Sequence, residues 1–216
     1  MKKKLSLLLA FVLILALCTA CGSGSDDIKA EDVVGHGAED YLGSYTENTY
    51  TNERYGIKFT TPSKDFEFAI LDEILEANDI QTDGYSNKKV PERLASGKDF
   101  MPMYGGDGNT GSNTSLVLSK VEAGTDRQKF IEDSYASIKK ILEDDTSIVI
   151  KELELKKGSP IGEDSYVSYV IEAKGMSFYT QQFYVFTDSD VGCVSISATS
   201  EANILSLQKS WKKINK

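Results

Sequence analysis

Residues 176–187 read MSFYTQQFYVFT, and this stretch decides the fold class. Aromatic side chains fall on both of its alternating faces, at Phe178, Tyr179, Phe183, Tyr184 and Phe186. A strand that is apolar on both faces belongs in the interior of a sheet that is covered on both sides. We therefore predict a central β-strand here.

Three further strand-like runs surround this strand, at residues 147–155, 166–173 and 191–199. They are separated by Gly, Pro, Asp and Lys, and such short connections favour antiparallel pairing. Residues 166–173 carry apolar side chains at alternate positions, which is typical of a strand in a packed sheet.

The first half of the chain adds another strand and a hairpin. Residues 55–61 alternate between apolar and polar side chains and end at Pro62. Residues 100–104 and 115–122 read as two strands around a Gly-rich connection. Together these runs predict an α+β domain with a mainly antiparallel sheet of about six strands, flanked by helices.

Three helices are predicted beside the sheet. A short one covers residues 71–78, and a longer one starts near Thr125, where the spacing to Gln128 fits a capping box, and runs to about Glu143. The last begins near Glu201 and is predicted from apolar residues at spacings of three, four and three: Ile204, Leu207, Trp211 and Ile214. Trp211 is expected to pack on the sheet.

The amino terminus has the order of an export signal. Lysines at positions 2–4 precede an apolar run of 13 residues, and a helix needs roughly 20 such residues to span a bilayer. Cys21 follows two small residues and resembles the acceptor cysteine of the bacterial lipobox, although Cys18 stands where that pattern usually has Leu. An ordinary secretory signal with a chance cysteine is the alternative. We predict lipid attachment at Cys21 and a location on the extracytoplasmic face of the cell membrane.

The predicted organisation has three parts: a signal peptide over residues 1–20, the lipidated Cys21 with a flexible tether over 21–51, and one domain over 52–216. Removing residues 1–20 removes three lysines and no acids, which leaves 21 Lys and Arg against 33 Asp and Glu and a formal charge of −12. Such a surface repels phosphate backbones and anionic lipid, so neither nucleic acid nor electrostatic membrane binding is expected.

Histidine chemistry is excluded from the predicted domain, because the single histidine, His36, falls in the tether. A Ser-His-Asp or Cys-His arrangement and a histidine-based zinc site need an imidazole on a rigid frame. Cys193 lies in a strand-like run, where burial as a small apolar side chain is favoured over a reactive role.

Carboxylates remain as possible acids and bases. The pairs Asp144/Asp145, Glu163/Asp164 and Asp188/Asp190 fall in predicted turns, where adjacent acids are usually solvated. Asp107 and Asn109 are faintly similar to an oxygen-rich calcium loop, but the distal Glu is missing, so a hairpin turn is favoured and calcium binding is left open. No catalytic, cofactor-binding or metal-binding residue is predicted.

The order of elements resembles the PsbP-like fold, which the Mog proteins share. The residues that carry the resemblance are Tyr55–Phe59 with Pro62, Gln182–Val185, Val194–Thr199 and Ser210–Ile214. The resemblance covers about residues 52–216. More specifically, the chain resembles uncharacterised lipoproteins of low-GC Gram-positive bacteria that have this fold. The resemblance implies binding of other macromolecules more often than catalysis, although one scaffold hosts many functions.

These observations favour a non-enzymatic lipoprotein that binds another component of the cell envelope, either a protein or a wall polymer. Two alternatives stay open at this point. One is a carboxylate-dependent hydrolase that acts on cell-wall glycans, and the other is an accessory subunit that rests permanently on a larger complex. The sequence leaves the partner, the oligomeric state and the physiological process open.

Overall fold

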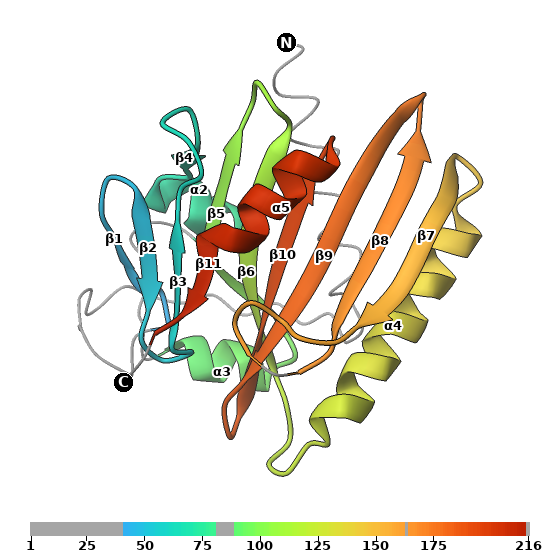
Figure 1. Cartoon of the computed structure of the whole chain (residues 1–216). Coiled ribbons are helices and arrows are strands. Elements are labelled where there is room, and N and C mark those ends of the chain that lie inside the picture. Colours follow the sequence, from blue (N-terminus) through green and yellow to red (C-terminus); the bar gives the residue numbers. More distant parts are fainter. Residues whose placement is uncertain (1–40, 81–88, 163, 215–216) are drawn as a thin grey trace.

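The computed structural model describes residues 41–80, 89–162 and 164–214, which form two antiparallel sheets and four helices (Figure 1). The large sheet has seven strands in the spatial order β4 (Glu67–Phe68), β5 (Phe100–Asp107), β6 (Ser112–Lys120), β10 (Asp190–Ala198), β9 (Met176–Phe186), β8 (Tyr166–Ala173) and β7 (Ile148–Lys156). The small sheet has the order β1 (Ser44–Tyr45), β2 (Thr49–Asn52), β3 (Ile57–Thr60) and β11 (Trp211–Lys213). The helices are α2 (Leu71–Ala77), α3 (Val90–Ala95), α4 (Arg127–Asp144) and α5 (Glu201–Ser210).

The predicted α+β class with a mainly antiparallel sheet is confirmed. All neighbouring strands in both sheets pair antiparallel. The large sheet has seven strands in place of about six, and the small sheet was not foreseen. The aromatic stretch forms β9, which lies between β10 and β8. Two adjacent residues of β9, Phe183 and Tyr184, enter different hydrophobic cores on the two faces of the sheet, as predicted for a central strand.

The first core lies between the large sheet and a layer made of the small sheet, α3 and α5 (Figure 1). Trp211 is its largest fully buried side chain, with its ring 5.2 Å from that of Phe59. The indole Nε1 of Trp211 donates a 3.0 Å hydrogen bond to Thr114 Oγ1 on β6, and this hydroxyl donates to the carbonyl of Ser195. The polar edge of the tryptophan is therefore satisfied inside an apolar core.

The second core forms where α4 packs against β7 and β8 on the opposite face. Ile131, Ile138 and Leu142 give this helix its buried stripe. The helix starts one residue later than the capping box predicted, because Asp126 is the N-cap and accepts from the backbone N–H of Lys129. An aspartate at this position satisfies a donor that the first helical turn leaves open.

The predicted end of the last helix is wrong. The last helix stops at Ser210, and Trp211–Lys213 forms strand β11, which pairs with β3 and places Trp211 opposite Phe59. The spacing of Trp211 and Ile214 fitted a helix, but pairing with the open edge of β3 satisfies the backbone instead. Trp211 is buried as expected, although from a strand.

The predicted tether ends too late at residue 51. Residues 44–45 and 49–52 are strands, and Tyr41, Tyr50 and Asn52 are buried. The Asn52 side-chain amide donates to the carbonyl of Tyr41 at 3.2 Å and to the hydroxyl of Tyr50 at 2.9 Å. Within the described residues, the domain therefore includes position 41 onward.

The predicted signal peptide, residues 21–40 with Cys21 and His36, and Glu163 lie outside the described residues. In the part that the structure does describe, no helix combines the length and the apolar character needed to cross a bilayer.

Candidate functional site

Two of the acidic turns singled out in the sequence serve their own backbone. Asp145 is exposed and accepts hydrogen bonds from the hydroxyl and the backbone N–H of Ser147, which lower its pKa. Asp107 accepts from the backbone N–H of Asn109 at 2.8 Å and of Thr110 at 3.4 Å, so it stabilises the β5–β6 hairpin turn. Across the described residues, no three His, Cys, Asp or Glu side chains are grouped so as to hold a metal ion.

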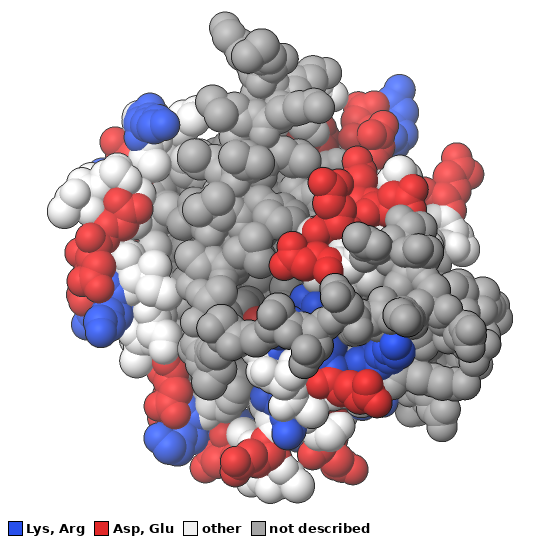
Figure 2. Space-filling view, turned by 180° about the vertical axis from the view of Figure 1, so that it is seen from behind, with Lys and Arg blue, Asp and Glu red and all other residues white. Residues whose placement is uncertain are grey.

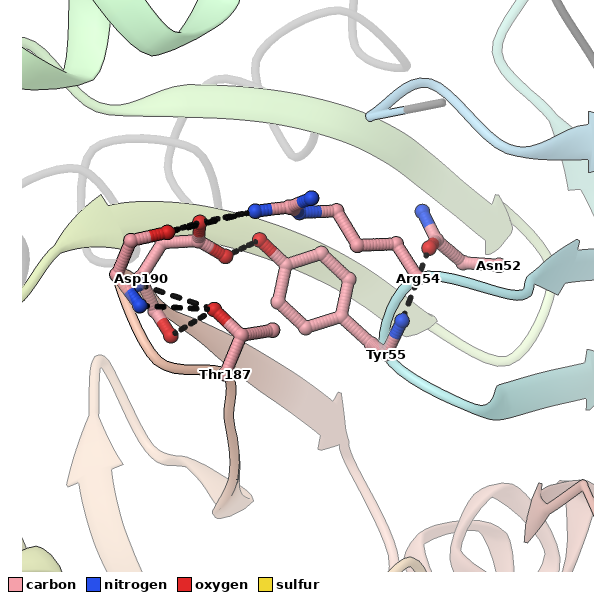
Figure 3. Close-up of polar contacts among 6 residues, drawn as sticks. Asn52, Arg54, Tyr55, Thr187 and Asp190 are labelled. Atoms are coloured by element: carbon pink, nitrogen blue, oxygen red, sulfur yellow. Dashed lines mark hydrogen bonds and ion pairs between the residues drawn. The ribbon is translucent and has the colours of Figure 1, made fainter. Parts of the chain in front are cut away.

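The turn with Asp188 and Asp190 corrects the prediction of solvated acids. Asp190 is 2% exposed and forms an ion pair of 2.6 Å with Arg54 Nη2. The hydroxyl groups of Tyr55 and Ser189 also donate to its carboxylate (Figure 3). Arg54 in turn stacks on the ring of Tyr41, with its guanidinium carbon 4.1 Å from the ring centre. We call these five residues the Arg54 cluster.

Electrostatics in the Arg54 cluster favour the ionised carboxylate. Burial alone would raise the pKa of Asp190, but the hydrogen bonds from Arg54, Tyr55 and Ser189 and the charge of Arg54 together lower it. Burial, followed by the charge of Asp190, raises the pKa of Tyr55, so its hydroxyl stays a donor. The cluster therefore holds a stable ion pair.

The local sequence explains how the Arg54 cluster is built. Arg54 and Tyr55 lie in the turn between β2 and β3, where Asn52 Oδ1 accepts from the backbone N–H of Tyr55 (Figure 3). Gly192 on β10 leaves room for the Tyr55 ring, because a Cβ there would lie 3.3 Å from it. The Arg54 cluster thus fastens the small sheet to the β9–β10 turn of the large one.

A second group of polar side chains lies in the middle of the large sheet. Cross-strand register places Asn113 of β6 opposite Ser197 of β10, and Ser197 opposite Thr180 of β9. One step along the strands, Ser115 lies opposite Ser195, and Ser195 opposite Gln182. Directly opposed residues share a face of a sheet. We call this array of three strands by two residues the polar grid: Asn113, Ser115, Thr180, Gln182, Ser195 and Ser197.

The polar grid is only partly satisfied by hydrogen bonds. The hydroxyls of Thr180 and Ser197 are 3.2 Å apart, and Gln182 Oε1 accepts from the hydroxyl of Tyr184 at 3.2 Å. Within the described part of the chain, Asn113 Oδ1 and Ser115 Oγ have no hydrogen-bond partner, and their residues are 7% and 0% exposed. A buried polar atom without a partner costs about 1–3 kcal/mol, so these two atoms lower the stability of the fold.

Tyrosines and small residues border the polar grid. Its neighbours on β5 are Gly106, opposite Asn113, and Tyr104, opposite Ser115. On β8, Tyr169 lies opposite Thr180. Among the described helices, α3 and α5 pack on β6, and both contribute to the first core on the other face. The polar grid therefore faces away from α5.

Cys193 lies beside the polar grid on the same face. Its Sγ is 3.9 Å from Ser195 Oγ and 4.0 Å from Gln182 Oε1. Burial raises the pKa of this thiol to about 12, so it is protonated at neutral pH. The predicted burial of Cys193 is confirmed.

On the face seen from behind, described Lys and Arg side chains lie beside described Asp and Glu side chains (Figure 2). The six residues of the polar grid are all uncharged. Sequence reasoning missed this array, although one signal was available. Serine at alternate positions 195 and 197, and Asn113 with Ser115, put polar side chains at alternate positions, which share one face of a strand.

Comparison with known proteins gives a distant structural likeness. No protein-family model matches the chain, and no curated protein sequence matches it. It is similar to the solution structure of cyanobacterial PsbP (CyanoP) from Synechocystis sp. PCC 6803, with 9% identity and a TM-score of 0.42, over 79% of this chain and 95% of that one. A crystal structure from Bacteroides thetaiotaomicron VPI-5482 gives 10% identity and a TM-score of 0.35, over 78% of this chain and 49% of that one.

The first likeness is to a PsbP protein, the fold family that the sequence resembles. At this level of identity and TM-score, neither likeness assigns a site, a partner or an activity to this chain. The α+β class rests on the strand pairing of the chain itself.

Proposed function

We propose that this protein is an extracytoplasmic lipoprotein, held at the cell membrane by lipid on Cys21, whose PsbP-like domain binds another component of the cell envelope without catalysing a reaction. The anchor is supported by the order of charged, apolar and small residues before Cys21. A membrane-held domain meets neighbouring components at high effective concentration, so weak binding suffices for function.

The observation that carries the binding role is the pair of unpartnered polar atoms in the polar grid, Asn113 Oδ1 and Ser115 Oγ. A purely structural sheet interior is stabilised by apolar side chains at these positions, because buried polar atoms cost free energy unless they are hydrogen-bonded. A ligand that supplied the missing hydrogen bonds would recover this free energy on binding. Unsatisfied polar groups of this kind are typical of sites that trade stability for function.

The anchor and the binding role are tested together in cells. Cys21→Ser should abolish labelling by a radioactive fatty acid and release the protein from the membrane fraction. Crosslinking of the anchored form should then capture envelope components that the Cys21→Ser form captures at a lower level. Membrane retention of the unlabelled variant would contradict the anchor. Equal capture by both forms would contradict the role of proximity, and glycan cleavage without any capture would favour an enzyme.

A further inference from the structure

The outer face of the small sheet carries an unusual set of side chains for an acidic protein. Cross-strand register puts one row of four residues and a second row of two on this face. We call them the lysine face: Ser44, Thr51, Lys58 and Lys212 in the first row, and Thr49 and Thr60 in the second. All six are hydroxyl or lysine side chains, and none is acidic or apolar.

The lysine face is open to solvent. The inner side of the same strands buries Tyr50 and Trp211 in the first core, whereas Lys58, Thr60 and Lys212 are exposed. Side chains alternate between the two faces along a strand, so the lysine face points away from the large sheet. The small sheet lies beside the large one in Figure 1, and its outer side offers an accessible surface.

The two lysines of the first row lie directly opposite each other on β3 and β11. Like charges in this position repel and destabilise the strand pair. Within the described residues, neither Lys58 nor Lys212 forms an ion pair, whereas Lys129 on α4 pairs with Asp133. An anionic surface laid against the lysine face would remove this repulsion.

The small sheet is also where the chain from the predicted anchor enters the domain. The described residues begin at Tyr41, three positions before β1, and β1 is one edge of the small sheet. Residues 21–40 remain as the predicted tether, and a flexible linker of 20 residues has a root-mean-square reach of about 25 Å. A domain of this size has a diameter of about 40 Å. The entry side of the domain therefore stays closest to the membrane.

We propose that the lysine face rests on the anionic head groups of the membrane that carries the anchor. This inference rests on the anchor in the proposed function and adds the orientation of the domain. The excess of acids in the mature chain predicts repulsion from anionic lipid. However, charges more than about 10 Å apart are largely screened at 0.1 M salt, so the lysines that touch the surface decide the contact. Each such lysine strengthens binding about fivefold.

A phosphodiester polymer of the wall would offer the lysine face the same charge. The entry point of the chain favours lipid, because the anchor holds lipid beside the small sheet at all times. Exposed Glu47 and Glu53 lie in the turns at opposite ends of the strands. They confine the contact with an anionic surface to the middle of the lysine face.

The test couples the mature chain, residues 21–216, to vesicles through Cys21 and a maleimide lipid. Cys193 is buried and its raised pKa keeps it protonated at neutral pH, so the maleimide reacts at Cys21. One set of vesicles is pure phosphatidylcholine, and the other has equal parts of phosphatidylcholine and phosphatidylglycerol. Acetylation of each lysine, followed by mass spectrometry, measures which lysines contact the surface.

Lys58 and Lys212 should be acetylated at least about threefold more slowly on the anionic vesicles, because contact covers the amines and favours their charged form. Salt at about 1 M should remove the difference. Lys140 is exposed on α4, which packs on the opposite face of the large sheet, and should react at the same rate on both vesicles.

Two variants with the same change of net charge sharpen the test. Lys58→Gln/Lys212→Gln removes the lysines of the face, and the exposed Lys213 beside them should then react equally on both vesicles. Lys139→Gln/Lys140→Gln is the matched control on α4 and should leave the slow acetylation of the lysine face unchanged.

Three results would overturn the proposal: equal acetylation of the lysine face on both vesicles, equal loss of protection in both variants, or protection by poly(glycerol phosphate) but not by anionic vesicles. The last result would assign the lysine face to a polymer. In each case, lipid labelling of Cys21 in cells would leave the proposed anchor standing. Membrane retention of unlabelled Cys21→Ser in cells would instead remove the anchor, whatever the vesicles show.

Discussion

The Arg54 cluster and the polar grid are both buried polar groups on the large sheet, yet they differ in how their atoms are satisfied. The carboxylate of Asp190 receives hydrogen bonds from Arg54, Tyr55 and Ser189, although Arg54 Nε has no hydrogen-bond partner among the described residues. The polar grid leaves Asn113 Oδ1 and Ser115 Oγ without partners among the described residues. A buried carboxylate that is ion-paired and hydrogen-bonded stabilises the fold that contains it, whereas buried polar atoms without partners lower the stability of the fold and recover that free energy only when a ligand binds. The difference separates a structural site from a candidate binding site.

The largest effect should come from breaking the Arg54 cluster. Arg54→Met leaves the nearly buried carboxylate of Asp190 without its counter-ion and should lower the free energy of unfolding by about 3–5 kcal/mol. Urea unfolding measures this change. The Arg54→Met/Asp190→Leu variant should recover much of the loss, because the remaining charge is removed as well.

Lys129→Met is the control for this comparison. Lys129 pairs with Asp133 on the exposed face of α4, and both side chains are more than half exposed. Its loss should change the free energy of unfolding by no more than about 0.5 kcal/mol. A loss below about 1 kcal/mol in Arg54→Met would mean that the Arg54 cluster does not fasten the two sheets.

A smaller effect should distinguish two neighbouring residues of β6 that point to opposite faces. Thr114→Val removes the acceptor of the Trp211 indole and should lower the free energy of unfolding by about 1–3 kcal/mol. Ser115→Ala removes a hydroxyl without a partner among the described residues and should leave stability unchanged or raise it by up to about 1 kcal/mol. Thermal and urea unfolding both measure the stability of the two variants. If Ser115→Ala is as unstable as Thr114→Val, the polar grid is structural.

The smallest effect concerns acid pH. The pKa of Asp190 is lower in the folded than in the unfolded state, so its contribution to stability is present above about pH 4 and is lost as the pH falls through the folded value. Burial raises the pKa of Asp99, although the Ser119 hydroxyl and Arg93 oppose this, so Asp99 acts with the opposite sign. Asp190→Asn should therefore flatten the loss of stability between about pH 6 and pH 2, and Asp99→Asn should steepen it.

Urea unfolding at a series of pH values checks both slopes. Ser115→Ala serves as the reference, because it removes no titratable group and should keep the slope of the parent chain. Parallel slopes for Asp190→Asn and the parent would mean that the ion pair does not hold the carboxylate ionised in the folded state.

Most elements of the fold could be predicted from the sequence, because their patterns were local. Each of these patterns lies within a single short segment of the chain: the aromatic stretch at 176–187, the alternating runs beside it, and the apolar stripe of α4. The small sheet could not be predicted this way. Tyr50 becomes a core residue and Trp211 a strand residue only when β2, β3 and β11 pair, and that pairing joins distant parts of the chain.

The candidate sites depended even more on register. Asp190 resembled a solvated turn residue because its partner, Arg54, lies in the first third of the chain. The serines of β10 form part of a polar array only because strand pairing aligns them with four other polar residues: Asn113, Ser115, Thr180 and Gln182. A sequence pattern shows which face a side chain takes, but strand pairing decides which other side chains share that face.

Strand β11 also has a consequence for the order in which the domain assembles. It places Trp211 beside Phe59, so one edge of the small sheet stays open until the chain has been made almost to residue 213. Contacts between such distant positions slow folding, because the intervening chain must be ordered before they form. A chain that emerges from a ribosome or a membrane channel with its amino end first would therefore remain incompletely folded during its passage. It would close its core in one late step, when Trp211 arrives.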